Sequence, residues 1–285
     1  MNPLPRLPVR DPEGHKGSYG TALLVGGSPS MSGAISLAAM AALRSGAGLV
    51  RVATSSQCLN VVAGHEPSYM TVPLPTDRKG RISLSAEAVI RKQAAAATAV
   101  ALGPGLGRSL GLDALVWRLY ADLPQPLVVD ADALNALSAR WSWDRLPAGP
   151  RVLTPHPGEF ARLLHREPIE PERREQMAVE LAAQSRTVVV LKGHRTLITD
   201  GRTWWKNTTG NPGMATGGSG DVLTGIITAL LCQHLPPFDA ARLGVFLHGL
   251  AGDLAAAELG QESLIASDLL RFLPAAFREF HRKNG

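Results

Sequence analysis

The sequence predicts an α/β fold in which a mostly parallel central sheet is covered by helices on both faces. Short apolar runs of strand length recur along the chain, and stretches of helical character alternate with them. The runs are apolar throughout rather than at every second position. Alternating strands and helices are typical of βαβ units, and continuously apolar strands are typical of a sheet buried on both faces.

Six strands of the parallel sheet are expected in chain order. They comprise residues 21–25, 49–53, 99–102, 127–129, 151–153 and 187–191. The helices expected among them comprise residues 34–45, 85–97, 111–121, 159–165 and 171–185. Residues 195–199 and 203–206 flank the turn Asp200-Gly201-Arg202 and predict a β-hairpin, with one of Trp204 and Trp205 in the core. Three helices without an intervening strand complete the chain.

Composition limits the classes of protein that fit. The chain has 285 residues, of which 45% are hydrophobic, and shows no repeat or convincing linker, so we expect a single domain over residues 1–285. Lysine and arginine exceed aspartate and glutamate by 29 to 24 but are scattered singly, which disfavours nucleic acid and suits an anionic small molecule. Cys58 and Cys232 have neither disulfide-framework nor zinc-ligand spacing. Because no secretory leader or long apolar stretch is seen, we expect a soluble, cytoplasmic protein without a membrane partner.

A glycine-rich segment before an apolar helix, Gly217-Gly218-Ser219-Gly220-Asp221, is the strongest candidate site. Glycines let a backbone approach a ligand closely, and amides at a helix N-terminus bind anions. A carboxylate in that position can accept a proton from a hydroxyl that attacks a phosphoryl group, while the amides stabilise the transferring charge. The helix start is also expected to favour the ionised form of Asp221. The same spacing fits a glycine turn whose aspartate merely caps the helix.

Further segments lie where predicted strands end, at the edge that binds ligands in open α/β folds. Small residues at 28–34 and the turn GPGLG at 103–107 permit close approach of a ligand, or close packing and a rigid connection. Asp130 and Asp132 would share a strand face, which is costly if they are buried without a cation or donors. Asp132 fits equally well as the N-cap of the next helix.

Two more segments carry polar groups at strand ends. His156 stands between two prolines in TPHPGE, where a lone histidine is usually structural but has little freedom. The segment KGHRT at 192–196 joins a strand to the hairpin. Its cation, glycine and hydroxyl can hold the phosphates and adenosine of a nucleotide, but on these residues alone an ordinary surface turn is the favoured interpretation.

Six blocks in order, over about residues 15–260, resemble the NAD(P)H-hydrate dehydratases of the ribokinase-like superfamily. The blocks are HKGSYGTALLVGGSPSMSGA, ALGPGLG, VVDADALN, LTPHPGEF, VLKGHRTLI and NPGMATGGSGDVLTG. The resemblance implies a ribokinase-like three-layer sandwich and a hydro-lyase that repairs the S epimer of hydrated NADH or NADPH. In the family, ADP or ATP phosphorylates the ring hydroxyl and phosphate then leaves, which restores the dihydropyridine and releases AMP or ADP. Bacterial members generally use ADP, and the residues themselves do not separate the two donors.

The resemblance also implies roles for individual residues. Asp221 would be the base and would touch the substrate, with Gly218 and Gly220 as amide donors to the phosphoryl group. Further substrate contacts are implied for Ala34, Gly105 or Gly107, and His156. The implied nucleotide site comprises Lys192, Gly193, His194, Arg195, Thr196 and Gly220. Glu159 matches the glutamate of an Asn-x-x-Glu pattern that helps place Mg²⁺, often through water; His156 replaces the asparagine, which leaves the metal placement open.

The family implies partners as well. Members are often homotetramers, so a homo-oligomer is expected, and a separate epimerase is expected to supply the S epimer. One alternative is a vitamin-precursor kinase of the same superfamily, such as a hydroxyethylthiazole kinase, which would stop at the phosphorylated product. Another is a nucleotide-binding regulator without chemistry. The segment around His156 and the GMATGG motif favour the dehydratase over the kinase. The presence of Asp221 beside an intact glycine turn argues against the regulator.

Overall fold

The computed structural model describes residues 3–146, 149–166 and 168–284, and the rest of the expected domain at 1–285 lies outside this part. Its described residues form one nine-stranded sheet in the order β3-β2-β1-β4-β5-β6-β7-β8-β9. Neighbouring strands are parallel from β3 through β7, and β8 and β9 are antiparallel. The strands are β1 Thr21–Val25, β2 Leu49–Ser55, β3 Met70–Leu74, β4 Ala99–Leu102, β5 Leu127–Val129, β6 Arg151–Leu153, β7 Val188–Leu191, β8 Leu197–Thr199 and β9 Trp204–Lys206.

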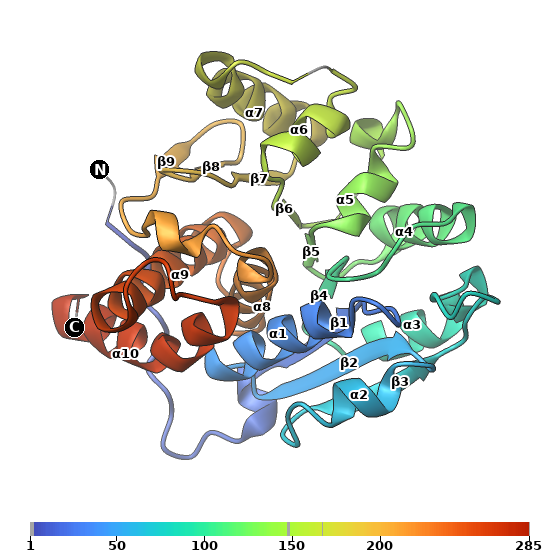
Figure 1. Cartoon of the computed structure of the whole chain (residues 1–285), viewed down its shortest axis with the longest axis horizontal. Helices are drawn as coiled ribbons and strands as arrows, with labels where there is room; N and C mark the ends of the chain where they lie inside the picture. The colour runs from blue at the N-terminus through green and yellow to red at the C-terminus, as the bar shows by residue number, and fades with distance from the viewer. Residues whose placement is uncertain (1–2, 147–148, 167, 285) are drawn as a thin grey trace.

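Helices cover both faces of this sheet, which confirms the expected three-layer α/β sandwich (Figure 1). One face carries α1 Ser32–Arg44, α2 Leu59–Ala63, α8 Ser219–Cys232, α9 Pro237–Leu259 and α10 Ala266–Asn284. The other carries α3 Glu87–Ala94, α4 Leu110–Asp122, α5 Asp132–Leu137, α6 Pro157–Leu163 and α7 Pro171–Ser185. Short 3₁₀ helices lie at Lys16–Tyr19, Leu84–Ala86, Trp143–Arg145 and Pro212–Met214.

The continuously apolar strands serve both layers because successive side chains point to opposite faces. In β1, Ala22 and Leu24 join the core beneath α1 and α8, whereas Leu23 and Val25 join the core beneath α3 and α4. All five residues of this strand are buried. Two hydrophobic cores, one on each face, therefore hold the sheet.

The six expected strands lie within two residues of their predicted bounds, and the hairpin is present with shorter strands. The three final helices are confirmed, as is the core position of one hairpin tryptophan, Trp205. The sequence reading missed α2 and the edge strand β3, whose Pro73 is tolerated where a backbone donor is not needed. The expected helix at 85–97 begins with a 3₁₀ turn and is α-helical over Glu87–Ala94.

The strand order reverses beside β1, since β2 and β3 extend the sheet on one side and β4 follows on the other. Such a reversal opens a crevice at the carboxyl ends of the strands, where open α/β folds bind ligands. Here Gly27 N donates to Pro104 O at 2.9 Å, and Gly103 N donates to Val25 O at 3.1 Å. The segments at 26–34 and 103–107 therefore line the expected edge.

Candidate active site

The glycine-rich turn lies at the start of α8, with Gly218 as the N-cap. Gly218 has φ 91°, and a Cβ there would lie 2.6 Å from Leu37 Cδ1, so both the backbone conformation and the space require glycine. A Cβ on Gly217 would meet nothing within 4 Å. The turn thus packs against α1 on one side and borders open space on the other.

Several backbone amides of this turn are available to a ligand. Ser219 N donates to Thr216 O at 3.4 Å, but within residues 3–146, 149–166 and 168–284 no acceptor is found for the amides of Gly217, Gly218, Gly220 and Asp221. His248 Nε2 lies 2.9 Å from Ser219 O, and burial lowers the pKa of this imidazole to about 4. The neutral ring donates to the carbonyl oxygen and fixes the helix start from α9.

Asp221 is the third residue of α8, and its protonation differs from the sequence expectation. Burial, and next the charge of Asp130, raise the pKa of Asp221 to about 7, although Lys192 acts in the opposite direction. A helix start favours a carboxylate by only about 0.3–1 kcal/mol, which is less than one pKa unit. Desolvation therefore outweighs the helix dipole, and the expected preference for the ionised form was wrong. A pKa near 7 suits a general base.

Asp130 and Asp132 do not share a strand face. β5 ends at Val129, and Ala131 turns the chain with φ 50° and ψ −119°. Asp130 is 1% exposed and accepts hydrogen bonds from Thr154, Thr224 and Lys192. Asp132 is not the N-cap of α5, which is Ala131; its Oδ2 instead accepts from Gly107 N at 2.8 Å.

His156 and Glu159 form the capping box of α6. His156 Nδ1 accepts from Gly158 N at 3.0 Å, and Glu159 Oε2 accepts from His156 N at 2.8 Å. Burial and the charge of Lys192 lower the pKa of His156, so its neutral form keeps the Nδ1 acceptor. The side chain remains 51% exposed, which leaves about half of it accessible to a ligand.

Glu159 does not fit a direct metal ligand. It is buried, its Oε2 already accepts from His156 N, and the Lys192 ammonium lies 3.7 Å from the same oxygen. Among the described residues no group of three or more His, Cys, Asp or Glu side chains could hold a metal ion. Mg²⁺ commonly keeps several waters and binds through substrate phosphates rather than a protein cage. A contact between Glu159 and Mg²⁺ through water stays a prediction.

The segment at 192–196 divides into two parts. Lys192 points into the carboxylate cluster, with its Nζ 2.8 Å from Asp130 Oδ1. Gly193, His194 and Arg195 are exposed, and Thr196 Oγ1 closes the loop by donating to Gly193 O at 3.0 Å.

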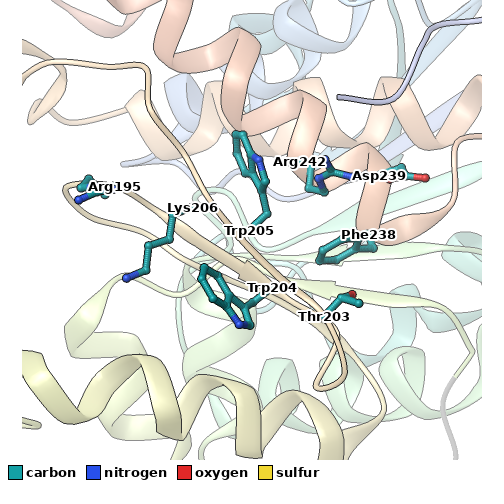
Figure 2. A pocket seen from close by; sticks show the side chains of 8 residues that line it. All are labelled: Arg195, Thr203, Trp204, Trp205, Lys206, Phe238, Asp239 and Arg242. Atoms are coloured by element: carbon teal, nitrogen blue, oxygen red, sulfur yellow. Dashed lines mark hydrogen bonds and ion pairs between the residues drawn. The ribbon is translucent and has the colours of Figure 1, made fainter. Parts of the chain in front are cut away.

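Arg195 also borders a cavity of about 560 Å³ along β9. Figure 2 shows Trp205 directed toward α9 beside Arg242, whereas Trp204 points away from it. Trp204 is 62% exposed, as expected for the hairpin tryptophan outside the core. Asp221 is not among the residues that line this cavity.

Three of the expected substrate residues, Ala34, Gly105 and Gly107, lie at the β1/β4 crevice. Gly105 has φ 59°, and a Cβ there would lie 2.3 Å from Met31 O and 3.1 Å from Ala34 Cβ. Close packing of the GPGLG turn against α1 is thus the reason for glycine at 105. Gly107, with φ 77°, has ordinary space around it and donates its amide to Asp132.

Three residues of this site were not singled out from the sequence. Thr224 follows Asp221 by one helical turn, a spacing that places both on one face. Thr154 and His248 carry no comparable signal, because their partners come from other elements. The structure brings Asp221, Gly220, Lys192 and Glu159 together around Asp130, with His156 at the rim.

Comparison with known proteins identifies the family. The model of the NAD(P)H-hydrate dehydratase family matches residues 22–275. The chain belongs to this family. It is 47% identical over 281 residues to the bifunctional NAD(P)H-hydrate repair enzyme of Moorella thermoacetica, with 98% of this chain and 53% of that protein covered. This chain therefore spans about half the length of that curated relative.

Another member of the dehydratase family matches over nearly its whole length. The ADP-dependent (S)-NAD(P)H-hydrate dehydratase of Bacillus subtilis is 38% identical over 279 residues, covering 96% of this chain and 95% of that one. A crystal structure of the Bacillus subtilis ADP/ATP-dependent enzyme, co-crystallised with ATP/Mg²⁺, superposes with a TM-score of 0.82 at 36% identity. That match covers 96% of this chain and 94% of the other. None of the helices in residues 3–146, 149–166 and 168–284 combines the length and the hydropathy that a transmembrane span requires.

Proposed function

We propose that this protein dehydrates the S epimer of hydrated NADH and NADPH at the expense of ADP or ATP, and so repairs the damaged nucleotide. The observation that carries the proposal is the juxtaposition of Asp221, whose pKa is raised to about 7, with amides that have no acceptor among the described residues. The Bacillus subtilis relative named for this activity matches the chain nearly end to end.

Asp221 accepts the proton of the ring hydroxyl as that oxygen attacks the terminal phosphorus of the nucleotide. The amides of Gly218 and Gly220 and the Lys192 ammonium stabilise the charge on the transferring phosphoryl group. The bond from phosphorus to the nucleotide breaks, and AMP leaves if ADP is the donor. The ring nitrogen then supplies the electron pair that expels phosphate, and loss of a proton from the ring carbon next to the one that carried the phosphate restores the double bond of the dihydropyridine.

The remaining assignments follow from position. Ala34, Gly105 and Gly107 at the β1/β4 crevice, and His156 at the start of α6, would contact the hydrated nicotinamide nucleotide, and residues 193–196 would hold the adenine nucleotide. Mg²⁺ would arrive with the nucleotide phosphates and screen their charge, with Glu159 contributing through water. An epimerase would supply the S epimer; two relatives that this chain half covers are named as bifunctional repair enzymes. We also propose that the protein is a homo-oligomer.

The test is to incubate the purified chain with hydrated NADH and either ADP or ATP. Return of the near-ultraviolet absorbance of reduced nicotinamide, with stoichiometric AMP or ADP, supports the dehydratase. A thiazole alcohol serves as the competing substrate: its phosphorylation without repair would instead support the vitamin-precursor kinase. Asp221→Asn should bind nucleotide but lose turnover, and retention of turnover would overturn the base assignment.

A further inference from the structure

Asp130 lies at the centre of a buried polar network behind the candidate active site. Its Oδ1 accepts from Thr154 Oγ1 and Lys192 Nζ, each at 2.8 Å, and its Oδ2 accepts from Thr224 Oγ1 at 2.8 Å. A carboxylate with 1% exposure is costly unless donors and a cation satisfy it, and this one has both.

The partners of Asp130 come from three different elements. Thr154 follows β6, Lys192 follows β7, and Thr224 lies in α8 one turn beyond Asp221. One side chain at the end of β5 therefore ties the ends of two neighbouring strands to the helix that carries the proposed base. The short side chains of Thr154 and Thr224 donate to different oxygens of Asp130, so they set the orientation of the carboxylate without help from Lys192.

The ion pair determines where the Lys192 ammonium lies. Nζ is 3.7 Å from Glu159 Oε2, and a Cβ built on Gly220 would be 3.2 Å from it. The ammonium is thus held beside Gly220, at the opening of the glycine turn. A lysine side chain is flexible, so a fixed counter-charge is needed to keep it at one point.

The backbone next to Asp130 adopts a conformation that is unfavourable for its residue. Ala131 has φ 50° and ψ −119°, which is unusual for a residue with a Cβ. This turn sends Asp130 into the network while Asp132 reaches the amide of Gly107. The strain persists because the two aspartates have different partners on either side.

We propose that Asp130 is a positioning residue that holds the Lys192 ammonium against the transferring phosphoryl group. Asp130 does not touch the substrate; it acts through Lys192. The inference rests on the proposed phosphoryl transfer at this site. A purely structural role for Asp130, as a staple between strands, would affect folding without depending on Lys192.

The test is a double-mutant cycle on the full-length protein, using pH-independent values of kcat/KM from complete pH profiles. Lys192→Met should lower kcat/KM by about 10²-fold, the usual cost of losing one donor to a developing oxyanion. Asp130→Asn, which leaves the ammonium present but unheld, should lower it by about ten- to a hundredfold, chiefly through kcat. The double variant should be no worse than Lys192→Met alone. Multiplicative losses would overturn the proposal.

A second cycle measures ADP binding by calorimetric titration in the presence of Mg²⁺ and does not need repair activity. Here too the Asp130→Asn effect should vanish in the Lys192→Met background. If the Asp130→Asn and Lys192→Met effects on ADP binding are coupled but the protein repairs no hydrate, the proposed function is wrong and the positioning role of Asp130 is supported. If the protein repairs the hydrate but the effects of the two substitutions are independent, the proposed function is supported and the positioning role of Asp130 is wrong.

Controls separate positioning from folding. Asp122→Asn removes an acid that pairs with Arg91 at 2.8 Å on the surface, and it should change neither cycle. If Asp130→Asn does not fold, Thr224→Val keeps both charges and removes one anchor of the carboxylate. It should give a smaller loss that disappears in the Lys192→Met background, and a loss that persists there would contradict the proposal.

Discussion

Gly220 and Lys192 face each other at the opening of the glycine turn, so closely that a Cβ on Gly220 would lie 3.2 Å from Lys192 Nζ. Alanine is favoured over glycine within a helix by about 0.5–1 kcal/mol. We therefore expect Gly220→Ala to raise the free energy of unfolding slightly while lowering kcat/KM by about tenfold or more, because the methyl group displaces the ammonium. Thermal unfolding and repair kinetics on the same preparation measure the two effects.

Gly111→Ala is the matched control. Gly111 also lies in the first turn of a helix, α4, but its added Cβ would meet no atom closer than 3.9 Å. It should gain similar stability without losing activity. Equal activity in both variants would show that the space beside Gly220 is not used by the reaction.

The rate should depend on the ionisation of Asp221. A base must be deprotonated, so kcat/KM is expected to fall below pH about 7, the raised pKa of Asp221. Asp130, Asp132 and Glu159 raise that pKa, and Lys192 lowers it. Asp130→Asn should therefore move the acid limb of the profile to lower pH. An unmoved limb, or one shifted upward, would show that another group controls it.

The free energy of unfolding should also depend on the ionisation of Asp221, but ionisation, which the reaction needs, lowers stability. Between the ordinary pKa of 3.8 and the folded value of about 7, the folded protein binds more protons at Asp221 than the unfolded chain does. Stability contributed by this group is therefore lost as pH rises through that window. We expect Asp221→Asn to be more stable than the parent at pH 8, by on the order of 1–3 kcal/mol, and equal to it at pH 4. Urea unfolding at both pH values tests this, and a difference at pH 4 alone would contradict it.

Arg151 should be important for folding rather than for chemistry. Its guanidinium is buried and donates to the carbonyl oxygens of Tyr120, Leu123 and Gln125, close to the end of α4. Burial lowers its pKa to about 10. Arg151→Met leaves those carbonyls without donors and should cost about 3–5 kcal/mol in denaturant unfolding.

Arg118→Met provides the comparison for Arg151. Arg118 is 54% exposed and pairs with Glu87 on the surface, where a salt bridge contributes about 0–1 kcal/mol. A cost for Arg118→Met as large as that for Arg151→Met would mean that the buried hydrogen bonds are not the cause.

His156→Asn separates helix capping from substrate contact. Asparagine caps helices at least as well as most residues, so stability should change by less than about 0.5 kcal/mol. The exposed imidazole is lost, so the KM for hydrated NADH should rise about tenfold while the KM for ADP stays unchanged. Unaltered kinetics would assign His156 to the capping box alone.

Local patterns were enough to predict the layers of this fold. The strands at 21–25, 99–102, 127–129 and 151–153 have the bounds expected from their apolar runs, because strands buried on both faces need a continuous run. β3 was missed because this edge strand is only partly buried and therefore lacks a continuous apolar run. The glycine turn and Asp221 were likewise readable, because turn, helix start and carboxylate are adjacent in the sequence.

The ion pair and the shifted pKa values of the site could not be predicted from local sequence patterns. Asp130 and Lys192 are 62 residues apart and meet only because β5, β6 and β7 are neighbours in the sheet. The pKa of Asp221 depends on the same assembly, so a rule about helix ends alone gave the wrong direction. Spacing predicts which groups occur at the carboxyl edge, whereas their mutual distances come from strand order.

The proposed base is mounted on a helix whose residues Val222 through Cys232 are all buried, between α1 and α9. A helix packed in this way cannot move toward an incoming ligand without disrupting the hydrophobic core. Any adjustment of the site to its two substrates must therefore come from other segments, such as the exposed residues 193–195. The position of Asp221 is therefore set by the interior packing of its helix, and a substitution at a buried residue of α8 should lower turnover as well as stability.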